Sequence, residues 1–589
     1  MKRKNVDNEG KFNYTFSMKK NINQRGFQRI SKKVMLWFTL AISLLIIFES
    51  GFLVHFPYWL HCTGFVLSLL FIFCGLFEFL FSILASSSKK EFIKRNWWNL
   101  IVFILIFATI KNFELSRFLA LVREILFLLL LLSKKKSFKD FFAQPFASNP
   151  TRLLAMSFIS IILIGTILLT FPVSSEMHER TPLVDALFTA TSATCVTGLI
   201  VKDTPKYWST FGKIIILLLI QAGGLGIMTF SVSIALIFGA KLGLREKMAM
   251  GEILEFPSVG QVGKIVKFIF KFTFIVEFIG MVILFFRWLP FFHSVKEALF
   301  FSIFHSVSAF CNAGFSLFSK SLTGFVSDPI VNVVMMLLII IGGIGFIVVF
   351  ELFRKEHFVK KWRFNRPELT VHTKIVVSMS LILIILGFIL FFIFEFDNVL
   401  IHEGIGGKLM ASLFQSITPR TAGFNTVNIS QLKDVTLFMI IFLMFIGASP
   451  GSTGGGIKTS TFAILILAVI NMIRSREDIE IFQRKIPKNV VYKAVTIVVV
   501  SGFIIIFGTS LLLITQKDSL IHLLFEVTSA FGTVGLSTGV TFRLSNIGKI
   551  IISMIIYIGR IGPLTLAYAV GRYSKKLKRE YPDARVMVG

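Results

Sequence analysis

Long apolar stretches separated by short polar or basic segments dominate the hydropathy pattern of this chain. Runs of about twenty apolar residues are long enough to cross the roughly 30 Å hydrocarbon core of a bilayer as helices. Such runs include residues 213–239, 332–350, 376–396 and 495–515. Lipid offers no hydrogen-bond partners, so spanning backbone must pair with itself, and the alternating pattern of barrel strands is absent. The pattern predicts an all-α polytopic membrane protein.

The beginning of the chain differs from the rest. Residues 1–33 are polar and basic, and we expect a cytoplasmic tail there. Residues 34–149 predict an extra N-terminal transmembrane block of about four helices. Their apolar segments lie near 34–56, 58–86, 97–115 and 117–133. A voltage sensor would need arginine at every third position along one helix, whereas the last segment offers only Arg117 and Arg123 at its entry. An appendage for assembly or stability is the favoured interpretation.

From about residue 150 one order of segments occurs four times: a long span, a short half-helix, a loop ending in glycine before Leu or Phe, and a second span. The loop glycines are Gly198, Gly314, Gly423 and Gly535, at intervals of 116, 109 and 112 residues (314−198, 423−314, 535−423). A regular period indicates one structural unit used repeatedly. We therefore predict four pore repeats around one pore, at 150–262, 263–372, 373–489 and 490–589.

Each repeat is expected to contain a first span, a half-helix and a second span. The expected segments are 153–172, 182–194 and 211–239; 265–289, 295–310 and 329–354; 374–396, 405–418 and 434–472; and 491–515, 518–531 and 546–572. The half-helices are too short to cross a bilayer. Irregular backbone at membrane depth persists only where protein buries it or water lines it. The loops therefore predict a pore lining.

The four loops offer backbone carbonyls rather than acidic side chains to an ion. A cation leaving water needs oxygens to replace its hydration shell, and rings of carbonyls supply them in cation filters. Glycine turns successive carbonyls toward one axis at low cost. We expect the ion-binding filter to comprise Cys195, Val196, Thr197, Gly198, Cys311, Asn312, Ala313, Gly314, Arg420, Thr421, Ala422, Gly423, Gly532, Thr533, Val534 and Gly535. Each glycine alone could be an ordinary helix C-cap, but four equivalent copies favour a filter for monovalent cations.

The second span of the third repeat is interrupted at residues 447–458. Pro450 and several glycines cannot continue a helix, and apolar sequence on both sides places the break at membrane depth. A discontinuous helix of this kind is typical of an ion path. The stretch nearly spells a phosphate-binding loop, but Ile457 separates the glycine from the lysine, which disfavours nucleotide binding. We expect a gate built from Gly451, Gly454, Gly455, Gly456, Lys458 and Arg560.

Three charged residues fall within apolar sequence. Arg560 follows Lys549 by eleven residues, or about 16 Å of helix. A midplane arginine costs about 2.5–3.5 kcal/mol on insertion scales, so we expect freed carbonyls of the 447–458 loop as its partners; the alternative is a side chain reaching the headgroups. Asp185 is expected to cap its half-helix. Glu526 is open between hydrogen bonding behind the filter and attraction of the ion.

The charge distribution sets the orientation. The formal net charge is +30, but the basic clusters lie between apolar segments on alternate sides. This positive-inside bias predicts a multi-pass protein of the cytoplasmic (inner) membrane with both termini in the cytoplasm, and it argues against a nucleic-acid partner. The four cysteines, Cys62, Cys74, Cys195 and Cys311, match neither a disulfide framework nor a zinc site. No clustered His, Asp or Glu suggests catalysis, so we expect no enzyme.

Three loops resemble the filters of a known family: Thr194-Cys-Val-Thr-Gly198-Leu, Pro419-Arg-Thr-Ala-Gly423-Phe-Asn and Ser529-Ala-Phe-Gly-Thr-Val-Gly535-Leu-Ser. They are similar to those of the potassium-translocating subunits of the Trk/Ktr/HKT superfamily. The break at 447–458 resembles its gate, and the tail at 581–589 is similar to the ending of the Ktr-type branch. The resemblance covers roughly 150–589, and the N-terminal block departs from the usual core.

The resemblance implies potassium uptake. We expect K⁺ to bind at the filter residues, no covalent cofactor, and Na⁺ as a candidate coupling ion for symport. It also implies a homodimer with one pore per protomer and a cytosolic nucleotide-binding regulatory ring as partner. A sodium-selective or Na/K-coupled transporter of the same architecture is the alternative. Glycine at Gly198 keeps the ring four-fold and favours potassium.

Overall fold

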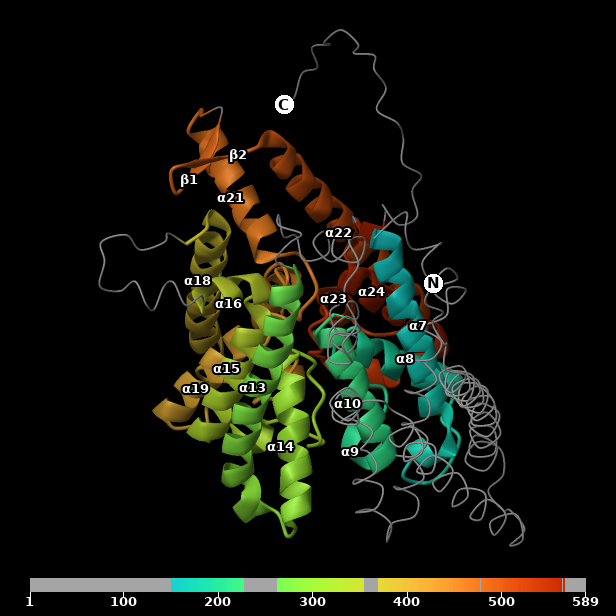
Figure 1. Ribbon diagram of the computed structural model, residues 1–589. Helices are drawn as coiled ribbons and strands as arrows, with labels where there is room; N and C mark the ends of the chain where they lie inside the picture. Colours follow the sequence, from blue (N-terminus) through green and yellow to red (C-terminus); the bar gives the residue numbers. More distant parts are fainter. Residues whose placement is uncertain (1–149, 227–261, 354–368, 477, 564, 567–589) are drawn as a thin grey trace, which may run out of the picture. The chain divides into compact units, whose positions relative to one another are not determined.

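A computed structural model describes residues 150–226, 262–353, 369–476, 478–563 and 565–566 (Figure 1). The chain divides into two units at Pro145, and all described residues belong to the second, Phe146–Gly589. The predicted N-terminal block at 34–149 and the tail at 581–589 lie outside the described residues.

The described chain is helical apart from one short hairpin, and its helices follow the predicted order. The first repeat contains α7 (Pro150–Thr170), α8 (Leu183–Thr194), the one-turn α9 (Thr204–Tyr207) and α10 (Thr210–Gly224). The second contains α13 (Val262–Trp288), α14 (Val295–Phe310), α15 (Pro329–Gly343) and α16 (Phe346–Leu352). The third contains α18 (Val371–Glu395), α19 (Ile405–Ile417), α20 (Asp434–Phe445) and α21 (Thr459–Ile473). The fourth contains α22 (Lys488–Thr515), α23 (Leu520–Gly532) and α24 (Asn546–Ile561).

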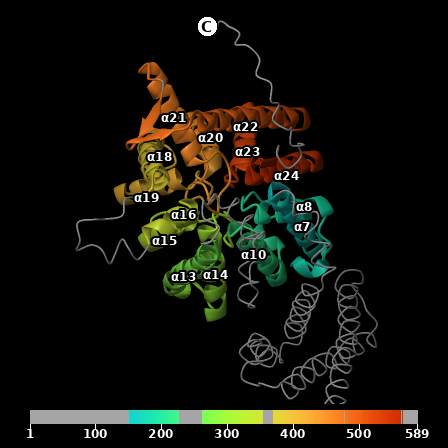
Figure 2. The same ribbon diagram turned by 45° about the horizontal axis from the view of Figure 1, so that its top comes forward.

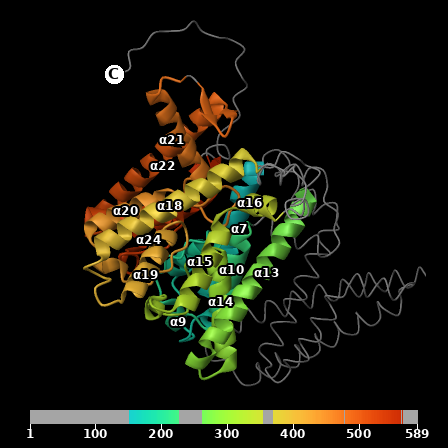
Figure 3. The same cartoon turned by 90° about the vertical axis from the view of Figure 1, so that its left-hand side faces the viewer.

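Three described helices are long and apolar enough to cross a membrane: Ile265–Phe291, Val371–Glu395 and Lys488–Thr515. Figure 3 shows α13, α18 and α22, the first spans of the second, third and fourth repeats, from another side. Each is the longest helix of its repeat. Many large apolar side chains along them are exposed, including Phe278, Ile382 and Phe503. Outward apolar faces on long helices suit contact with lipid. The predicted all-α polytopic membrane fold is confirmed.

Several helices begin where the sequence supplies a cap. The Ser209 side chain accepts a hydrogen bond from the Gly212 amide at the start of α10, and Ser545 does the same for Gly548 in α24. Asp328 accepts from the amides of Ile330 and Val331, and Pro329 fills the first position of α15. Capping side chains bond helix amides that have no partner within the helix, and an N-terminal proline has no amide hydrogen that would need one. These local signals determine where three of the second spans begin.

The second span of the second repeat differs from its prediction as one helix over 329–354. It breaks between α15 and α16, and the two pieces are bent by 101°. The break contains Gly345, whose φ of 100° lies in the region that side chains rarely adopt. The Phe346 amide donates to the Gly451 carbonyl of the third repeat, at 2.9 Å. A tertiary contact therefore holds the bend.

The helices of neighbouring repeats pack in a closed order (Figure 2). Each half-helix packs on the first span of its own repeat: α8 on α7, α14 on α13, α19 on α18 and α23 on α22. Between repeats, α10 packs on α14, α15 on α19, α20 on α23, and α24 on α8. The fourth repeat thus contacts the first, as the third contacts the fourth. Fully buried aromatic rings of the half-helices and loops, such as Phe188, Phe310 and Phe525, fill this interior.

The third repeat ends in the antiparallel hairpin of β1 (Ile479–Ile481) and β2 (Arg484–Ile486). Its turn residues, Phe482 and Gln483, both have positive φ angles. This conformation matches the twist of a two-residue hairpin. The hairpin joins α21 to α22.

Candidate functional site

The four predicted glycines meet in a ring. Their φ angles are positive, at 93° for Gly198, 69° for Gly314, 77° for Gly423 and 94° for Gly535. A β-carbon on each would lie near the carbonyl oxygen of the residue that precedes the next glycine: 2.5 Å for Gly198 to Ala313, 3.0 Å for Gly314 to Ala422, 2.3 Å for Gly423 to Val534 and 2.1 Å for Gly535 to Thr197. The order closes on itself. One chain therefore brings four main-chain carbonyls around a common centre, and a side chain at any of the four glycines would crowd the next loop in a backbone conformation that side chains rarely adopt.

The loops share a second backbone feature. The residue two positions before each glycine also has a positive φ: 57° at Val196, 59° at Asn312, 77° at Thr421 and 49° at Thr533. Such angles are uncommon for residues with side chains and are rarer still for β-branched ones. Backbone strain of this kind persists only where the surroundings enforce it, often at functional sites. The recurrence shows that all four loops share these two left-handed positions.

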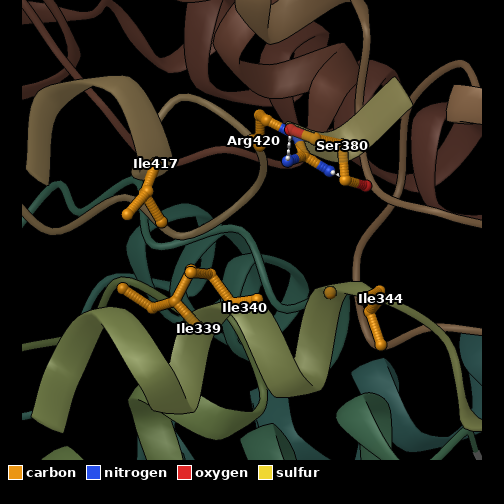
Figure 4. A pocket seen from close by; sticks show the side chains of 7 residues that line it. Ile339, Ile340, Ile344, Ser380, Ile417 and Arg420 are labelled. Carbon is orange, nitrogen blue, oxygen red and sulfur yellow. Dashed lines mark hydrogen bonds between the residues drawn. The ribbon is translucent and has the colours of Figure 1, made fainter. Parts of the chain in front are cut away.

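Burial separates one predicted filter residue from the others. The non-glycine members that are fully buried are Cys195, Val196, Thr197, Cys311, Asn312, Ala313, Thr421, Ala422, Thr533 and Val534. Arg420 is half-buried, and its guanidinium points away to α18 (Figure 4). There it donates to the Ser380 carbonyl at 3.3 Å and to the Ser380 hydroxyl at 3.0 Å. The guanidinium therefore takes no part in the ring.

Serine side chains hold three of the four loops. The Ser192 hydroxyl donates to the Leu199 carbonyl at 2.7 Å and accepts from the Gly198 amide. Ser308 donates to the Phe315 carbonyl at 2.8 Å, and Ser529 accepts from the Gly535 amide at 3.1 Å. Each serine precedes its ring glycine by six residues. The third loop has Ile417 at that position, and Thr418 donates to the Phe424 carbonyl instead.

Close helix packing places the half-helix ends at the ring. A β-carbon on Gly223 would lie 1.8 Å from the Thr194 carbonyl oxygen, and one on Gly342 would lie 1.9 Å from that of Phe310. The same holds in the fourth repeat, at 1.9 Å from Gly559 to Phe531. All three carbonyls belong to the residue four positions before a ring glycine. The half-helices thus direct their negative C-terminal ends toward the ring, which favours a cation there.

The ring forms the floor of an open cavity of about 580 Å³. All four ring glycines line it, together with charged side chains that include Asp203, Lys320 and Glu403. These two acidic side chains and one basic side chain leave a small excess of negative charge in the lining. An ion entering this cavity reaches the glycine ring directly.

The predicted break of the third repeat lies on the other face of the loops, between α20 and α21. The Gly455 amide donates to the Thr533 hydroxyl at 2.9 Å, and a β-carbon on Gly454 would lie 2.2 Å from the Thr421 hydroxyl. Both threonines precede a ring glycine by two residues. The 447–458 loop therefore packs against two of the four filter loops.

Further contacts tie this loop to the second repeat and to itself. The Thr453 amide and hydroxyl both donate to the Gly342 carbonyl, and the Ser449 amide donates to that of Gly343. Lys458 donates to the Gly454 carbonyl at 2.7 Å. Gly451 and Gly456 have positive φ angles of 66° and 70°. The predicted gate residues between Gly451 and Lys458 thus belong to one compact loop.

Arg560 reaches this loop from the fourth repeat. Its guanidinium donates to the Thr453 carbonyl in the loop and to the Gly223 carbonyl at the end of α10. It also lies over the Phe158 ring, 5.8 Å from the ring centre. Freed carbonyls of the 447–458 loop were the predicted partners, and the Thr453 contact confirms this. The arginine joins the first, third and fourth repeats.

Asp185 lies in the first turn of α8, as predicted, where its negative charge favours the helix start. Pro182, the residue before α8, supplies no capping side-chain hydrogen bond. The Asp185 carboxylate pairs with Lys549 at 2.6 Å and with Lys202 at 3.5 Å. Lys549 is 364 residues away in sequence, so no local pattern could indicate the pair. The ion pair fastens the fourth repeat to the first half-helix.

Three buried polar residues near the ring were not predicted. Gln221 of α10 donates to the Glu277 carboxylate of α13 at 3.1 Å, joining the first two repeats. His305 contacts the segment that follows Gly314. A lone buried polar residue in apolar sequence gives little signal. Alignment of the repeats on their glycines would, however, show that His305 and Glu526 occupy equivalent positions.

An all-α membrane protein with re-entrant half-helices around one ring has the architecture of an ion transporter. The TrkH family model, described as cation transport protein, matches residues 120–577. The Ktr system potassium uptake protein B of Bacillus subtilis is 42% identical over 443 residues, covering 75% of this chain and 97% of that protein. The potassium/sodium uptake protein NtpJ of Enterococcus hirae is 37% identical over 448 residues, covering 75% and 97%.

The fold agrees with a solved structure. The crystal structure of the potassium transporter TrkH from Vibrio parahaemolyticus matches with a TM-score of 0.56 and 19% identity, over 71% of this chain and 85% of that one. The chain belongs to the TrkH family of membrane cation transport proteins. The family match begins at residue 120, so most of the predicted N-terminal block lies outside it.

Proposed function

We propose that this chain is the ion-translocating subunit of a potassium uptake system in the cytoplasmic membrane. The closed ring of four glycines, each beside a main-chain carbonyl of the next loop, carries the proposal. Carbonyl rings replace the hydration shell of a cation. The similarity to proteins named for potassium uptake supports K⁺ as the ion. The predicted filter residues supply the binding oxygens through their main chains.

The proposed path has three stages. A hydrated ion enters the open cavity above the ring, loses water among the carbonyls, and passes the 447–458 loop to the cytoplasm. The membrane potential supplies about 2.3 kcal/mol per charge per 100 mV for inward movement. The four half-helix ends lower the cost of holding a bare cation because their dipoles present negative charge.

The 447–458 loop is proposed to act as the gate. It packs against Thr421 and Thr533 of the filter loops, and the Arg560 guanidinium holds its Thr453 carbonyl. Release of that contact would free the loop to move. The basic segments between spans favour cytoplasmic termini, and they offer a surface to the proposed nucleotide-binding regulatory ring. A homodimer with one pore per protomer completes the proposal.

Uptake into proteoliposomes tests the function. We expect the purified chain to take up rubidium as a potassium tracer, with strong competition from K⁺ and weak competition from Na⁺. Gly198→Ser should abolish this preference, because its β-carbon would lie 2.5 Å from the Ala313 oxygen. Gly404→Ala is the matched control, since its β-carbon would have no neighbour within 4 Å. Equal competition by the two ions would favour the sodium-selective or Na/K-coupled alternative, which the potassium/sodium name of the Enterococcus relative motivates.

Arg560→Gln tests the gate. A neutral amide is too short to hold both carbonyls, so basal uptake should rise and respond less to a regulatory partner. Unchanged uptake and regulation would contradict the role given to Arg560.

A further inference from the structure

Two buried residues occupy the same place in different half-helices. Glu526 precedes Gly535 by nine residues, and His305 precedes Gly314 by nine (535−526 and 314−305). Neither side chain has any exposed surface. Both lie behind the filter loop of their own repeat.

Glu526 binds the segment that follows the fourth ring glycine. Its carboxylate accepts from the Ser537 hydroxyl at 2.6 Å and from the Thr538 amide at 2.9 Å. The Thr541 hydroxyl donates to the second carboxylate oxygen. The Gly539 amide in turn donates to the Ser537 hydroxyl at 2.9 Å. The carboxylate therefore fixes the first turn of chain beyond the ring.

His305 makes the same contacts in the second repeat. Its Nε2 atom lies 3.0 Å from the Ser316 hydroxyl and accepts from the Leu317 amide at 3.3 Å. The Phe318 amide donates to the Ser316 hydroxyl at 2.9 Å. Since Nε2 accepts, the ring proton belongs on Nδ1, which lies 2.8 Å from the Phe301 carbonyl.

The two networks share three hydrogen bonds. In each network, the buried residue accepts hydrogen bonds from the hydroxyl of the residue two positions after the glycine and from the amide three positions after it. The amide four positions after the glycine donates to that same hydroxyl. An imidazole and a carboxylate differ in charge but share the ability to accept these bonds. The common element is therefore hydrogen-bond acceptance, not charge.

The other two repeats lack this arrangement. The corresponding residues are Thr189, whose hydroxyl donates to the Asp185 carbonyl within its own helix at 2.9 Å, and the apolar Phe414. The positions two after the glycine hold Ile200 and Asn425. Because the loops meet in the order first, second, third, fourth, the second and fourth lie opposite each other.

We propose that His305 and Glu526 are equivalent positioning residues that brace opposite loops of the ring and thereby set which monovalent cation it prefers. The inference rests on the proposed potassium function. Ser316, Ser537 and Thr538 line the cavity above the ring, so the braced segments form its entrance. These two braced corners keep their carbonyls from closing on a smaller ion.

The loop side of the brace gives the cleanest test. Ser316→Ala and Ser537→Ala each remove one hydroxyl and leave the half-helix intact. We expect each to lower the preference for K⁺ over Na⁺ by roughly fivefold and to raise the apparent KM for rubidium, with maximal uptake little changed. The double variant should lose more. Rubidium uptake into proteoliposomes, with K⁺ or Na⁺ as competitor, measures these effects in the two single variants and the double variant.

Conservative and drastic changes at Glu526 separate positioning from charge. Glu526→Gln keeps an acceptor for Ser537 and Thr538 and should retain the preference, whereas Glu526→Leu should lose it. Thr189→Val is the matched control, because its hydroxyl bonds only within its helix. Wild-type ion preference and KM in both serine variants would overturn the proposal. Absence of uptake by the unaltered chain would instead refute the proposed function.

Discussion

The third repeat differs from the other three at two neighbouring places. In the first, second and fourth repeats a serine holds the filter loop, and a second-span glycine packs against the half-helix end. The third repeat has Ile417 in place of the serine, and Arg420 binds Ser380 of α18. Its second span opens into the 447–458 loop instead of packing on the half-helix.

This difference shows how one repeated unit can carry two roles. Three repeats hold the ring by tight internal packing. Protein interiors are packed about as densely as organic crystals, so such packing leaves little room for movement. The third repeat gives up that packing to supply the loop beside Thr421 and Thr533. Its filter loop is held by the Thr418 hydroxyl and, in addition, by Arg420, which binds Ser380 of α18.

The largest expected effect comes from the glycines that pack under half-helices. Gly223→Ala, Gly342→Ala or Gly559→Ala would place a β-carbon within 1.9 Å of a main-chain oxygen that cannot rotate away. Overpacking of this kind costs about 1–3 kcal/mol or more. We expect little folded protein in size-exclusion chromatography and a lower Tm.

Gly406→Ala is the control for these variants, because nothing lies within 4 Å of its β-carbon position in α19. Alanine there should be neutral or stabilise by about 0.5–1 kcal/mol. Similar losses in all four variants would show that the packing argument is wrong.

Gly447 is the counterpart in the third repeat, and its variant should behave differently. A β-carbon would lie 2.2 Å from the Gly455 carbonyl oxygen, within the loop itself. Gly447→Ala should therefore displace the loop from Thr533 while the protein stays folded. Loss of about one hydrogen bond shifts a two-state equilibrium roughly fivefold. Basal rubidium uptake should rise by that order, and a variant as unstable as Gly559→Ala would erase the distinction between the repeats.

The smallest effect concerns the lateral support of the third loop. Ser380→Ala removes one of the two acceptors of Arg420 and should cost about 1 kcal/mol. Ser378→Ala is matched to it, being two residues away on α18, exposed, and bonded within its own helix. Thermal unfolding in detergent compares the two. Equal Tm values would remove the assigned role of Arg420.

Local sequence carries much of this fold. The half-helix predicted at 295–310 coincides with α14, and the predicted break at 447–458 falls between α20 and α21. Both depend on strong local signals, namely apolar length and a dense run of glycine with proline. The bend at Gly345 was missed because single glycines in apolar sequence are often tolerated in helices. That bend depends on the Gly451 carbonyl, about a hundred residues away.

The ring was predictable for a related reason. Its glycines recur at one period, so repetition within a single sequence replaces information from relatives. Side-chain contacts between repeats leave no such trace. Asp185 pairs with Lys549, and Gln221 with Glu277, through tertiary packing alone. The positions of the ring glycines could therefore be predicted from the sequence. The polar side chains that support the ring are known only from the folded structure.

The closure of the ring by Gly535 against the Thr197 oxygen has a consequence for biogenesis. During synthesis the first three corners are made long before the last, so the nascent chain holds an open crescent until α23 and its loop leave the ribosome. The ring therefore cannot close before the fourth repeat has been made.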